Sequence, residues 1–355
     1  MTMPETPEPG QVAARPLADL ERHKDGADPN ELLRHRYLCR GGGVLIVGPT
    51  GVGKSSLSLQ LAIQWALGRE CFGIVPTRPL TSLIIQAEND DGDLAEMRDG
   101  VIKGLGLSEA DAKTAGESVF VWREDSRSGV EFFEEVVIEL LKRQPVDLFF
   151  IDPVLAFMKG EASSQKDVGM FLRKQLNPVL QAGKCGAILL HHTNKPPTGK
   201  NKGELSGSER AYLGSGSIEW ANWPRGVLAL CKTSSDGVFE LVAGKRGGRL
   251  GWRSDDDLES LSKLISHSKE AGEICWGEAD DDETPRKGRP KSLDAEVIFR
   301  LLPSEGLSAG EWKSKSVEAL AISESTFHRL RRALLKEKRI ILDPETKRWT
   351  PLITT

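Results

Sequence analysis

Between Val44 and about Trp252, short apolar runs alternate with longer segments in which apolar residues recur every three or four positions. The short runs are typical of strands buried on both faces, and the longer segments are typical of helices. The predicted strands are VLIVG, TSLIIQAE, VFVWRE, VDLFFID, GAILLHH, RGVLALCK and VFELVAGKR, and the predicted helices span 54–67, 93–104, 129–144 and 167–183. This order predicts an α/β fold with a mostly parallel central sheet flanked by helices, whose ligands bind at the carboxyl ends of the strands.

The pattern changes on both sides of this region. Residues 1–25 are rich in Pro, Glu and Ala, which predicts a disordered leader, and a short helix is expected over 28–38. Residues 26–252 form the predicted main domain, and the charged stretch 253–292, poor in aromatic residues, is the predicted linker. In residues 293–355, three short helical patterns precede a hairpin that turns at 343–346. This arrangement predicts a small winged helix-turn-helix domain.

Composition narrows the class of protein. The 355 residues are 39% hydrophobic, and the five cysteines contain no C-x-x-C pair, which fits reduced thiols better than a disulfide framework or a zinc site. No apolar stretch reaches the roughly 20 residues that a membrane helix needs, and the acidic, Pro-rich start is unlike a signal peptide. We therefore expect a cytoplasmic protein without a membrane partner.

The stretch GPTGVGKSS, which follows the first predicted strand and opens a helix, fits the phosphate-binding P-loop pattern G-x-x-x-x-G-K-[ST]. Its glycines let backbone N–H groups surround the phosphates at a helix N-terminus, Lys54 reaches the β- and γ-phosphates, and the Ser55 hydroxyl binds Mg²⁺. The sequence thus predicts ATP and Mg²⁺ as cofactors. The expected nucleotide-binding residues are Gly48, Thr50, Gly51, Val52, Gly53, Lys54, Ser55 and Ser56.

Two acidic residues complete the predicted chemistry. Asp152 ends the strand VDLFFID and suits a Walker B role, binding Mg²⁺ together with Ser55. The next residue is Pro153, so the glutamate that often activates the attacking water at that position is missing. Glu88, at the end of TSLIIQAE, is the predicted general base. Its neighbours Asn89, Asp90 and Asp91 leave that assignment open.

The strand GAILLHH ends in His191 and His192. A polar side chain at this strand end is placed to contact the γ-phosphate and to report hydrolysis to the next loop. Alternation along the strand does not decide which histidine faces the nucleotide, and His192 is the favoured one. The alternative is that one histidine only closes the strand.

Together, the segments GGGVLIVGPTGVGKSSLSLQLAIQWALG, LIIQAEND, LFFIDPVLAF, LLHHTNKP and LGSGSIEWANWPRGVLAL resemble the RecA-type ATPases of the plasmid replicative helicase RepA group. The resemblance covers roughly residues 30–252. It implies a RecA-like core that assembles as a homo-hexamer or other ring, with ATP at subunit interfaces. It also implies a basic residue inserted from the neighbouring subunit. Arg225 matches that position, Lys245 and Arg246 are further candidates, and Arg210 is a lesser one.

The resemblance also implies loops that contact single-stranded DNA in the ring channel. One is the loop containing Lys195, Lys200 and Lys202, and a Lys-rich loop without a DNA role is the alternative. In the C-terminal domain, Ser323 is the expected N-cap of a helix that buries Phe327, Leu330, Leu334 and Leu335. Exposed residues of that helix and of the wing are DNA-binding candidates, although docking to another protein is also possible. They are Ser325, Thr326, Arg329, Arg332, Lys347 and Arg348, with His328 and Arg331 also expected to be exposed.

These features predict a Mg²⁺-dependent RecA-like ring ATPase that acts on DNA, as a replicative helicase-like motor of a plasmid, phage or other mobile element. The alternative is an ATP-gated DNA-binding regulator or replication initiator, in which ATP controls oligomerisation rather than translocation. A recombinase-like filament is less favoured, because no N-terminal polymerisation segment is evident.

Overall fold

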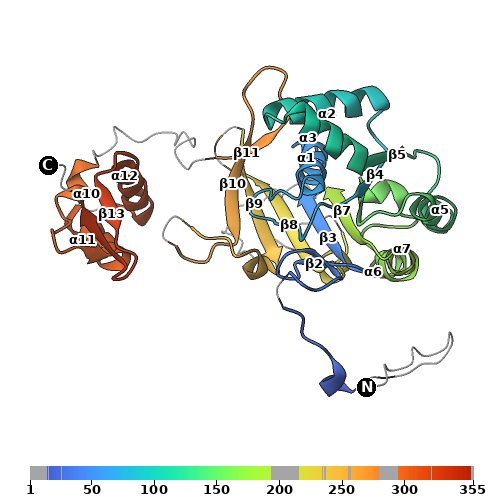
Figure 1. Cartoon of the computed structure of the whole chain (residues 1–355), viewed down its shortest axis with the longest axis horizontal. Helices are drawn as coiled ribbons and strands as arrows, with labels where there is room; N and C mark the ends of the chain where they lie inside the picture. The colour runs from blue at the N-terminus through green and yellow to red at the C-terminus, as the bar shows by residue number, and fades with distance from the viewer. Residues whose placement is uncertain are drawn as a thin grey trace.

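A nine-stranded mixed sheet organises the larger part of the molecule (Figure 1). The computed structural model describes residues 14, 16–24, 26–192, 216–233, 235, 237–254, 257–279, 295–320 and 322–352. The strand order is β11-β10-β9-β8-β3-β7-β6-β4-β5. The parallel part consists of β3 (Gly43–Gly48), β4 (Ser82–Gln86), β5 (Val119–Arg123), β6 (Leu148–Asp152), β7 (Gly186–His192) and β8 (Gly226–Lys232).

Each central strand is buried on both faces, which explains why its sequence is continuously apolar. In β6, Leu148 and Phe150 belong to one hydrophobic core and Phe149 and Ile151 to the other. Helices α1 (Lys54–Ala66), α2 (Asp91–Gly104) and α3 (Glu109–Ser118) cover the first face. The second face is covered by two composite helices, α4 (Gly129–Glu131) continuing through η2 (Phe132–Val137) and α5 (Ile138–Arg143), and α6 (Gln165–Met170) continuing through η4 (Phe171–Leu176) and α7 (Asn177–Gly183). The predicted fold class is confirmed.

Residues 28–38 do not form the expected helix. They contribute β1 (Glu31–Leu33) and the start of β2 (Leu38–Cys39), a short antiparallel pair. His35 and Arg36, with φ of 57° and 55°, make the turn between them. The apolar spacing misled the prediction because the hairpin buries Leu32, Leu33, Tyr37 and Leu38 together.

The predicted linker 253–292 also differs from the structure over its first half. After β9 (Val238–Lys245), β10 (Ser262–His267) and β11 (Trp276–Glu278) extend the central sheet in antiparallel fashion. These edge strands carry a mixture of polar and apolar residues because most of the β10 side chains are only half-buried. The prediction therefore missed two strands of the sheet, because they lie in a charged stretch poor in aromatic residues.

The C-terminal residues form a separate core from α10 (Glu296–Phe299), α11 (Ala309–Leu320) and α12 (Glu324–Lys336). The predicted hairpin is β13 (Ile340–Leu342) and β14 (Arg348–Pro351), and Asp343 supports its turn by accepting hydrogen bonds from the backbone N–H groups of Glu345 and Thr346. A further strand, β12 (Leu307–Ser308), pairs with β14 and makes a three-stranded sheet.

Two expectations for α12 are wrong in detail. Ser323 caps the helix as predicted, accepting from the Thr326 backbone N–H at 3.2 Å. However, Leu335 is 47% exposed, whereas Arg331 is buried, with its guanidinium 4.9 Å from the Trp349 ring centroid. An arginine can cover aromatic surface with its aliphatic stem and its planar cation, so the spacing of the apolar residues did not reveal its position.

Asp147, just before β6, joins three segments of the main fold. Its Oδ1 accepts from Arg40 Nη2 and Arg78 Nη2, both at 2.6 Å, and its Oδ2 accepts from the Thr81 backbone N–H at 3.1 Å. Burial by itself would raise the pKa of Asp147, but the hydrogen bonds from Arg78, Thr81 and Arg40 outweigh it and the pKa is lowered. The carboxylate therefore favours the folded state above its ordinary pKa, and this contribution is lost as pH falls through the lowered value.

We expect Asp147→Asn to reduce the free energy of unfolding at pH 7 by about 2 kcal/mol, because it leaves two guanidinium groups without their shared anion. Arg78 is half exposed, so water offsets part of the loss. Urea unfolding measures the change, and the difference from the wild type should shrink as the pH is lowered into the acid range. Asp99→Asn, which removes an exposed ion pair with Arg98, is the matched control and should change little.

Candidate active site

The P-loop lies where β3 ends and α1 begins, at the carboxyl edge of the parallel strands. Gly51 and Gly53 have φ of 74° and 86°, a region that residues with a Cβ rarely adopt. An added Cβ at Gly51 would meet no atom within 4 Å, so this side of the loop is open. The loop therefore has the backbone conformation and the free space that a phosphate group requires.

Lys54 and His192 meet beside this loop. Lys54 Nζ donates to the carbonyl oxygens of Gly48 and Pro49 at 3.0 and 2.8 Å, and lies 3.1 Å from His192 Nδ1. Since an ammonium group can only donate, Nδ1 accepts and His192 is in the neutral form with its proton on Nε2. Burial, followed by the Lys54 charge, lowers the pKa of His192 and favours this form.

His191 points the other way, into the core. It is fully buried, its ring packs against Trp220 with centroids 4.6 Å apart, and burial lowers its pKa to about 4. Its Nδ1 lies 2.6 Å from the backbone oxygen of His192. The structure thus places His192, and not His191, against the P-loop, although sequence alternation left the choice open.

Asp152 and Ser55 form the second pair of the site. Asp152 is buried at the end of β6, and the Ser55 hydroxyl lies close enough to its carboxylate to act on its pKa. Burial raises the pKa of Asp152, while Ser55, Gln86 and the charge of Lys54 act in the opposite direction. A hydroxyl and a carboxylate beside the expected phosphate position are oxygen ligands of the kind Mg²⁺ prefers.

Glu88 is exposed just after the end of β4 and is oriented through Gln86. Gln86 Oε1 accepts from the Glu88 backbone N–H at 3.0 Å, and Gln86 Nε2 donates to Asp152 Oδ2 at 3.1 Å. The Glu88 carboxylate acts electrostatically on both Lys54 and His192, so it lies in the same cluster. Sequence reasoning missed Gln86, whose position two residues before Glu88 was the available signal.

The acidic neighbours of Glu88 have structural roles. Asp90 is the N-cap of α2, where its side chain accepts from the Asp93 backbone N–H at 2.8 Å. The Asp93 side chain accepts from the Asp90 backbone N–H at 3.2 Å, which completes a capping box. Asp91 is the first residue of the helix. Of these carboxylates, Glu88 is the one that acts on the Lys54–His192 pair.

The predicted interface residues lie at the opposite edge of the sheet. The Arg225 backbone N–H donates to Gly43 O at 2.7 Å, at the start of β3, whereas the P-loop begins at its end. At about 3.3 Å per strand residue, the separation is roughly 17 Å. Lys245 Nζ donates to the carbonyl oxygens of Ala221 and Asn222, both at 2.8 Å, and so closes α9 (Glu219–Asn222).

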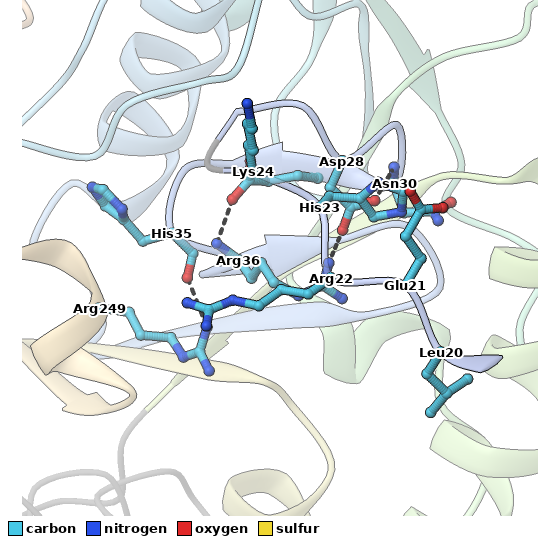
Figure 2. Close-up of a pocket in the computed structure, with 11 residues that line it drawn as sticks. Leu20, Glu21, Arg22, His23, Lys24, Asp28, Asn30, His35, Arg36 and Arg249 are labelled. Atoms are coloured by element: carbon cyan, nitrogen blue, oxygen red, sulfur yellow. Dashed lines mark hydrogen bonds and ion pairs between the residues drawn. The ribbon is translucent and has the colours of Figure 1, made fainter. Parts of the chain in front are cut away.

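A cavity of about 660 Å³ opens near this edge (Figure 2). It is lined by residues of the 20–36 segment and by Arg249, whose Nη1 donates to the His35 carbonyl at 2.8 Å. Arg36 forms an ion pair with Asp28 in the same wall. Burial is the largest cause that lowers the pKa of Arg246, and the positive charges of Arg225, Arg249 and Arg36 lower it further. These four arginines therefore lie close together. This basic cluster is distinct from the P-loop site.

Several predicted DNA-binding residues, and one of the candidates for the basic residue inserted from a neighbouring subunit, fall outside the part of the chain that the structure describes. Lys195, Lys200, Lys202 and Arg210 lie outside the described residues, as does the side chain of Ser325. In the C-terminal unit, Lys347 and Arg348 are exposed on the β13–β14 turn and the start of β14. Thr326, Arg329 and Arg332 are half-buried on α12, less open than expected, because α10 and α11 pack against that helix.

The residues present fit ATP with Mg²⁺. The open, glycine-rich loop suits the phosphates, Lys54 supplies a cation, and the Ser55–Asp152 pair suits the metal ion. Together with Glu88 and His192, these groups lie at the carboxyl ends of β3, β4, β6 and β7, as the sequence led us to expect. Two further contacts, from His267 and Trp276 to the P-loop, were not foreseen, because more than 200 residues separate the partners.

Comparison with known proteins extends this picture. A protein-family model described as an AAA domain matches residues 8–198, a range that includes the P-loop and the ends of β4, β6 and β7. A crystal structure of the RadB recombinase is similar over 64% of this chain and 88% of its own, with 13% sequence identity and a TM-score of 0.41. A second solved structure, of an ATPase domain, is similar over 66% of this chain and 84% of its own, with 12% identity and a TM-score of 0.45. No curated protein matches this sequence.

None of the helices within the described residues combines the length and the apolar character needed to cross a membrane.

Proposed function

Since this chain belongs to the AAA domain family, we propose that it is a Mg²⁺-dependent ATPase that assembles as a ring and acts on DNA. The observation that carries the proposal is the convergence of Lys54, Ser55, Asp152, Glu88 and His192 at one sheet edge. The family match supports ATP binding and hydrolysis, and the roles given to the individual residues are our inference.

In the proposed reaction, Lys54 and the P-loop N–H groups would bind the phosphates, and Ser55 and Asp152 would hold Mg²⁺, which would offset the phosphate charge. Glu88 accepts a proton from the water that attacks the γ-phosphorus, while the bond from that phosphorus to the β–γ bridging oxygen breaks and ADP leaves. Gln86 links Glu88 to Asp152 through its hydrogen bonds to both residues. His192, bonded to Lys54 before nucleotide binds, exchanges this contact for the γ-phosphate. The His191 ring packs on Trp220, which lies in the segment leading to Arg225. A movement of His192 would therefore displace that segment through His191 and Trp220.

Ring assembly is supported by where the basic residues lie. Arg225 is roughly 17 Å from the P-loop of its own chain, too far for its side chain to reach the phosphates there. It can therefore contribute to hydrolysis only at the site of a neighbouring copy. We propose Arg225 as the residue that acts in trans, since its side chain is exposed while Lys245 is bonded to α9.

We further propose a RecA-like, helicase-like motor of the RepA type from a plasmid, phage or other mobile element. Basic residues of 193–215 would bind single-stranded DNA, because that segment connects the His192 strand end with the residues that lead to Arg225. The C-terminal unit, with three helices and a β13–β14 turn, would be a winged helix that binds duplex DNA.

One observation favours a second function, an ATP-gated DNA-binding regulator or replication initiator. Lys347 and Arg348 are exposed beside α12, in a unit with its own hydrophobic core. Such a unit can bind duplex DNA without help from the ATPase site. In that case ATP would control oligomerisation rather than movement.

Steady-state phosphate release distinguishes the two functions. We expect single-stranded DNA to stimulate turnover at least about tenfold over protein alone, because a motor couples hydrolysis to its track, with little stimulation by duplex DNA. Replacing Lys195, Lys200 and Lys202 by Ala should remove the stimulation and leave the basal rate. Turnover indifferent to single strands, together with duplex binding that survives these substitutions, would favour the regulator.

Mixing two inactive variants tests whether the site lies between subunits. Arg225→Ala and Glu88→Gln should each abolish turnover alone. Mixed in equal amounts and allowed to exchange subunits, they should recover part of it, because some interfaces then join an intact Glu88 to an intact Arg225. Arg143→Ala, an exposed arginine on α5, is the matched control and should remain active alone. No recovery in a mixture that demonstrably exchanges subunits would exclude Arg225 as the trans-acting residue.

A further inference from the structure

The β10–β11 hairpin, which lies beyond the residues matched by the family model, reaches back to the P-loop. His267 ends β10 and Trp276 begins β11, and the two residues pair across the hairpin. Their rings lie 3.7 Å apart between centroids, and Phe239 on β9 packs edge-on against both. The aromatic cluster fixes where the polar edges of His267 and Trp276 point.

His267 contacts the loop backbone directly. Its Nε2 lies 3.1 Å from the carbonyl oxygen of Val52. A carbonyl can only accept, so Nε2 carries a proton, which the neutral ring provides. Burial lowers the pKa of His267 and favours that neutral form, although the Val52 contact acts in the opposite direction. His267 also lies so close that a Cβ on Gly53 would come within 2.6 Å of its ring.

Trp276 contacts the peptide unit between Gly53 and Lys54 indirectly, through the Ser56 hydroxyl. The indole Nε1–H donates to Ser56 Oγ at 3.1 Å, and Ser56 Oγ donates to Gly53 O at 2.8 Å. Gln60 holds Trp276 in place, with its side chain bonded to both the backbone N–H and the backbone oxygen of Trp276 at 2.7 and 2.8 Å. The indole is buried, so this relay is shielded from water.

The two contacts set successive peptide planes. In a trans peptide, the C=O and the following N–H point in opposite directions. Holding the Val52 carbonyl toward His267 therefore turns the Gly53 N–H away from the hairpin. Holding the Gly53 carbonyl toward Ser56 does the same for the Lys54 N–H. These N–H groups belong to the part of the loop that binds phosphates in P-loop proteins.

We propose that His267 and Trp276 are positioning residues that preorganise the P-loop for nucleotide, so that the β10–β11 hairpin sets the affinity for ADP and ATP. The inference rests on the proposed function only in assuming that the P-loop binds nucleotide. It also makes residues beyond the matched family domain necessary for full affinity, and it links the nucleotide to the last described residues before the C-terminal unit.

Two substitutions of His267 separate hydrogen bonding from packing. His267→Gln retains an N–H donor at a similar reach, whereas His267→Phe retains an aromatic ring and loses the donor. Binding of a fluorescent ADP with Mg²⁺ should weaken about tenfold in His267→Phe, the effect of one lost hydrogen bond, and less than about threefold in His267→Gln. Trp276→Phe should weaken binding to a similar extent as His267→Phe. Ser266→Ala, whose side chain lies on the other face of β10, is the matched control.

A second readout follows the hairpin itself. Adding ADP and Mg²⁺ should slow amide hydrogen exchange over 262–278 in the wild type and in His267→Gln, but much less in His267→Phe. Equal weakening of binding by His267→Phe and His267→Gln would overturn the proposal in favour of packing, and wild-type affinity in His267→Phe would overturn it outright. If the unchanged protein bound no nucleotide, the proposed function would fail first, and this inference would fail with it.

Discussion

Replacing Lys54 by Ala should abolish ATP hydrolysis. The ammonium group lies at the centre of the site, 3.0 and 2.8 Å from two P-loop carbonyl oxygens and within the field of Asp152 and Glu88. When phosphates occupy the loop, it is the cation that compensates for their charge in this partly buried environment. We expect turnover to fall at least about 100-fold and ADP affinity to fall by more than about tenfold, measured by phosphate release and by titration with fluorescent ADP.

The control must exclude a general loss of structure. Lys54 is buried, and its removal leaves the carbonyl groups of Gly48 and Pro49 without that donor, so thermal unfolding should be followed in parallel. Lys113→Ala, on the exposed surface of α3, changes the same charge far from the loop and should leave turnover and affinity unaltered. Near-normal hydrolysis by a folded Lys54→Ala protein would remove the P-loop as the catalytic site.

The parts of this site that could be predicted from sequence depend on local pattern. A buried strand, a glycine-rich turn and a helix follow each other within 43–66, so the loop and Lys54 were evident. Asp152 ends a run of apolar residues that is typical of a strand buried on both faces. Parallel strands bring such ends to one edge, which predicted the meeting of Glu88, Asp152 and His192 without knowledge of the strand order.

What escaped prediction depends on distant packing or on side-chain direction. His267 and Trp276 reach the P-loop through two antiparallel edge strands, and nothing in the residues near Gly53 indicates that partner. The choice between His191 and His192 required the register of β7 against β3, where His192 lies opposite Gly48. Arg331 was expected at the surface because it lies off the apolar face formed by Phe327, Leu330 and Leu334, but it is buried against the rings of Phe327 and Trp349.

The residue that activates water is the part of the mechanism where local sequence is least decisive, since the four residues 88–91, just after β4, are all polar. The structure separates them by what they already do. Asp90 and Asp93 are bonded to each other's backbone at the start of α2, and Asp91 is inside the helix. Glu88 precedes the cap, is exposed, and is tied through Gln86 to the Asp152 carboxylate.

Glu88→Gln should therefore lower turnover by roughly 100- to 10,000-fold, the usual contribution of a general base. Its nucleotide affinity should stay close to that of the wild type, because the amide keeps the size of the side chain and the phosphate contacts are elsewhere. Asp90→Asn is the matched control: asparagine is an equally good N-cap, so α2 should persist and turnover should remain. Loss of turnover in Asp90→Asn with normal turnover in Glu88→Gln would reverse the assignment. Loss of turnover in Glu88→Gln alone would show that Glu88 is the general base, a role that Pro153, the residue after Asp152, cannot fill. Glu88 follows β4, which pairs with β6, the strand that ends in Asp152.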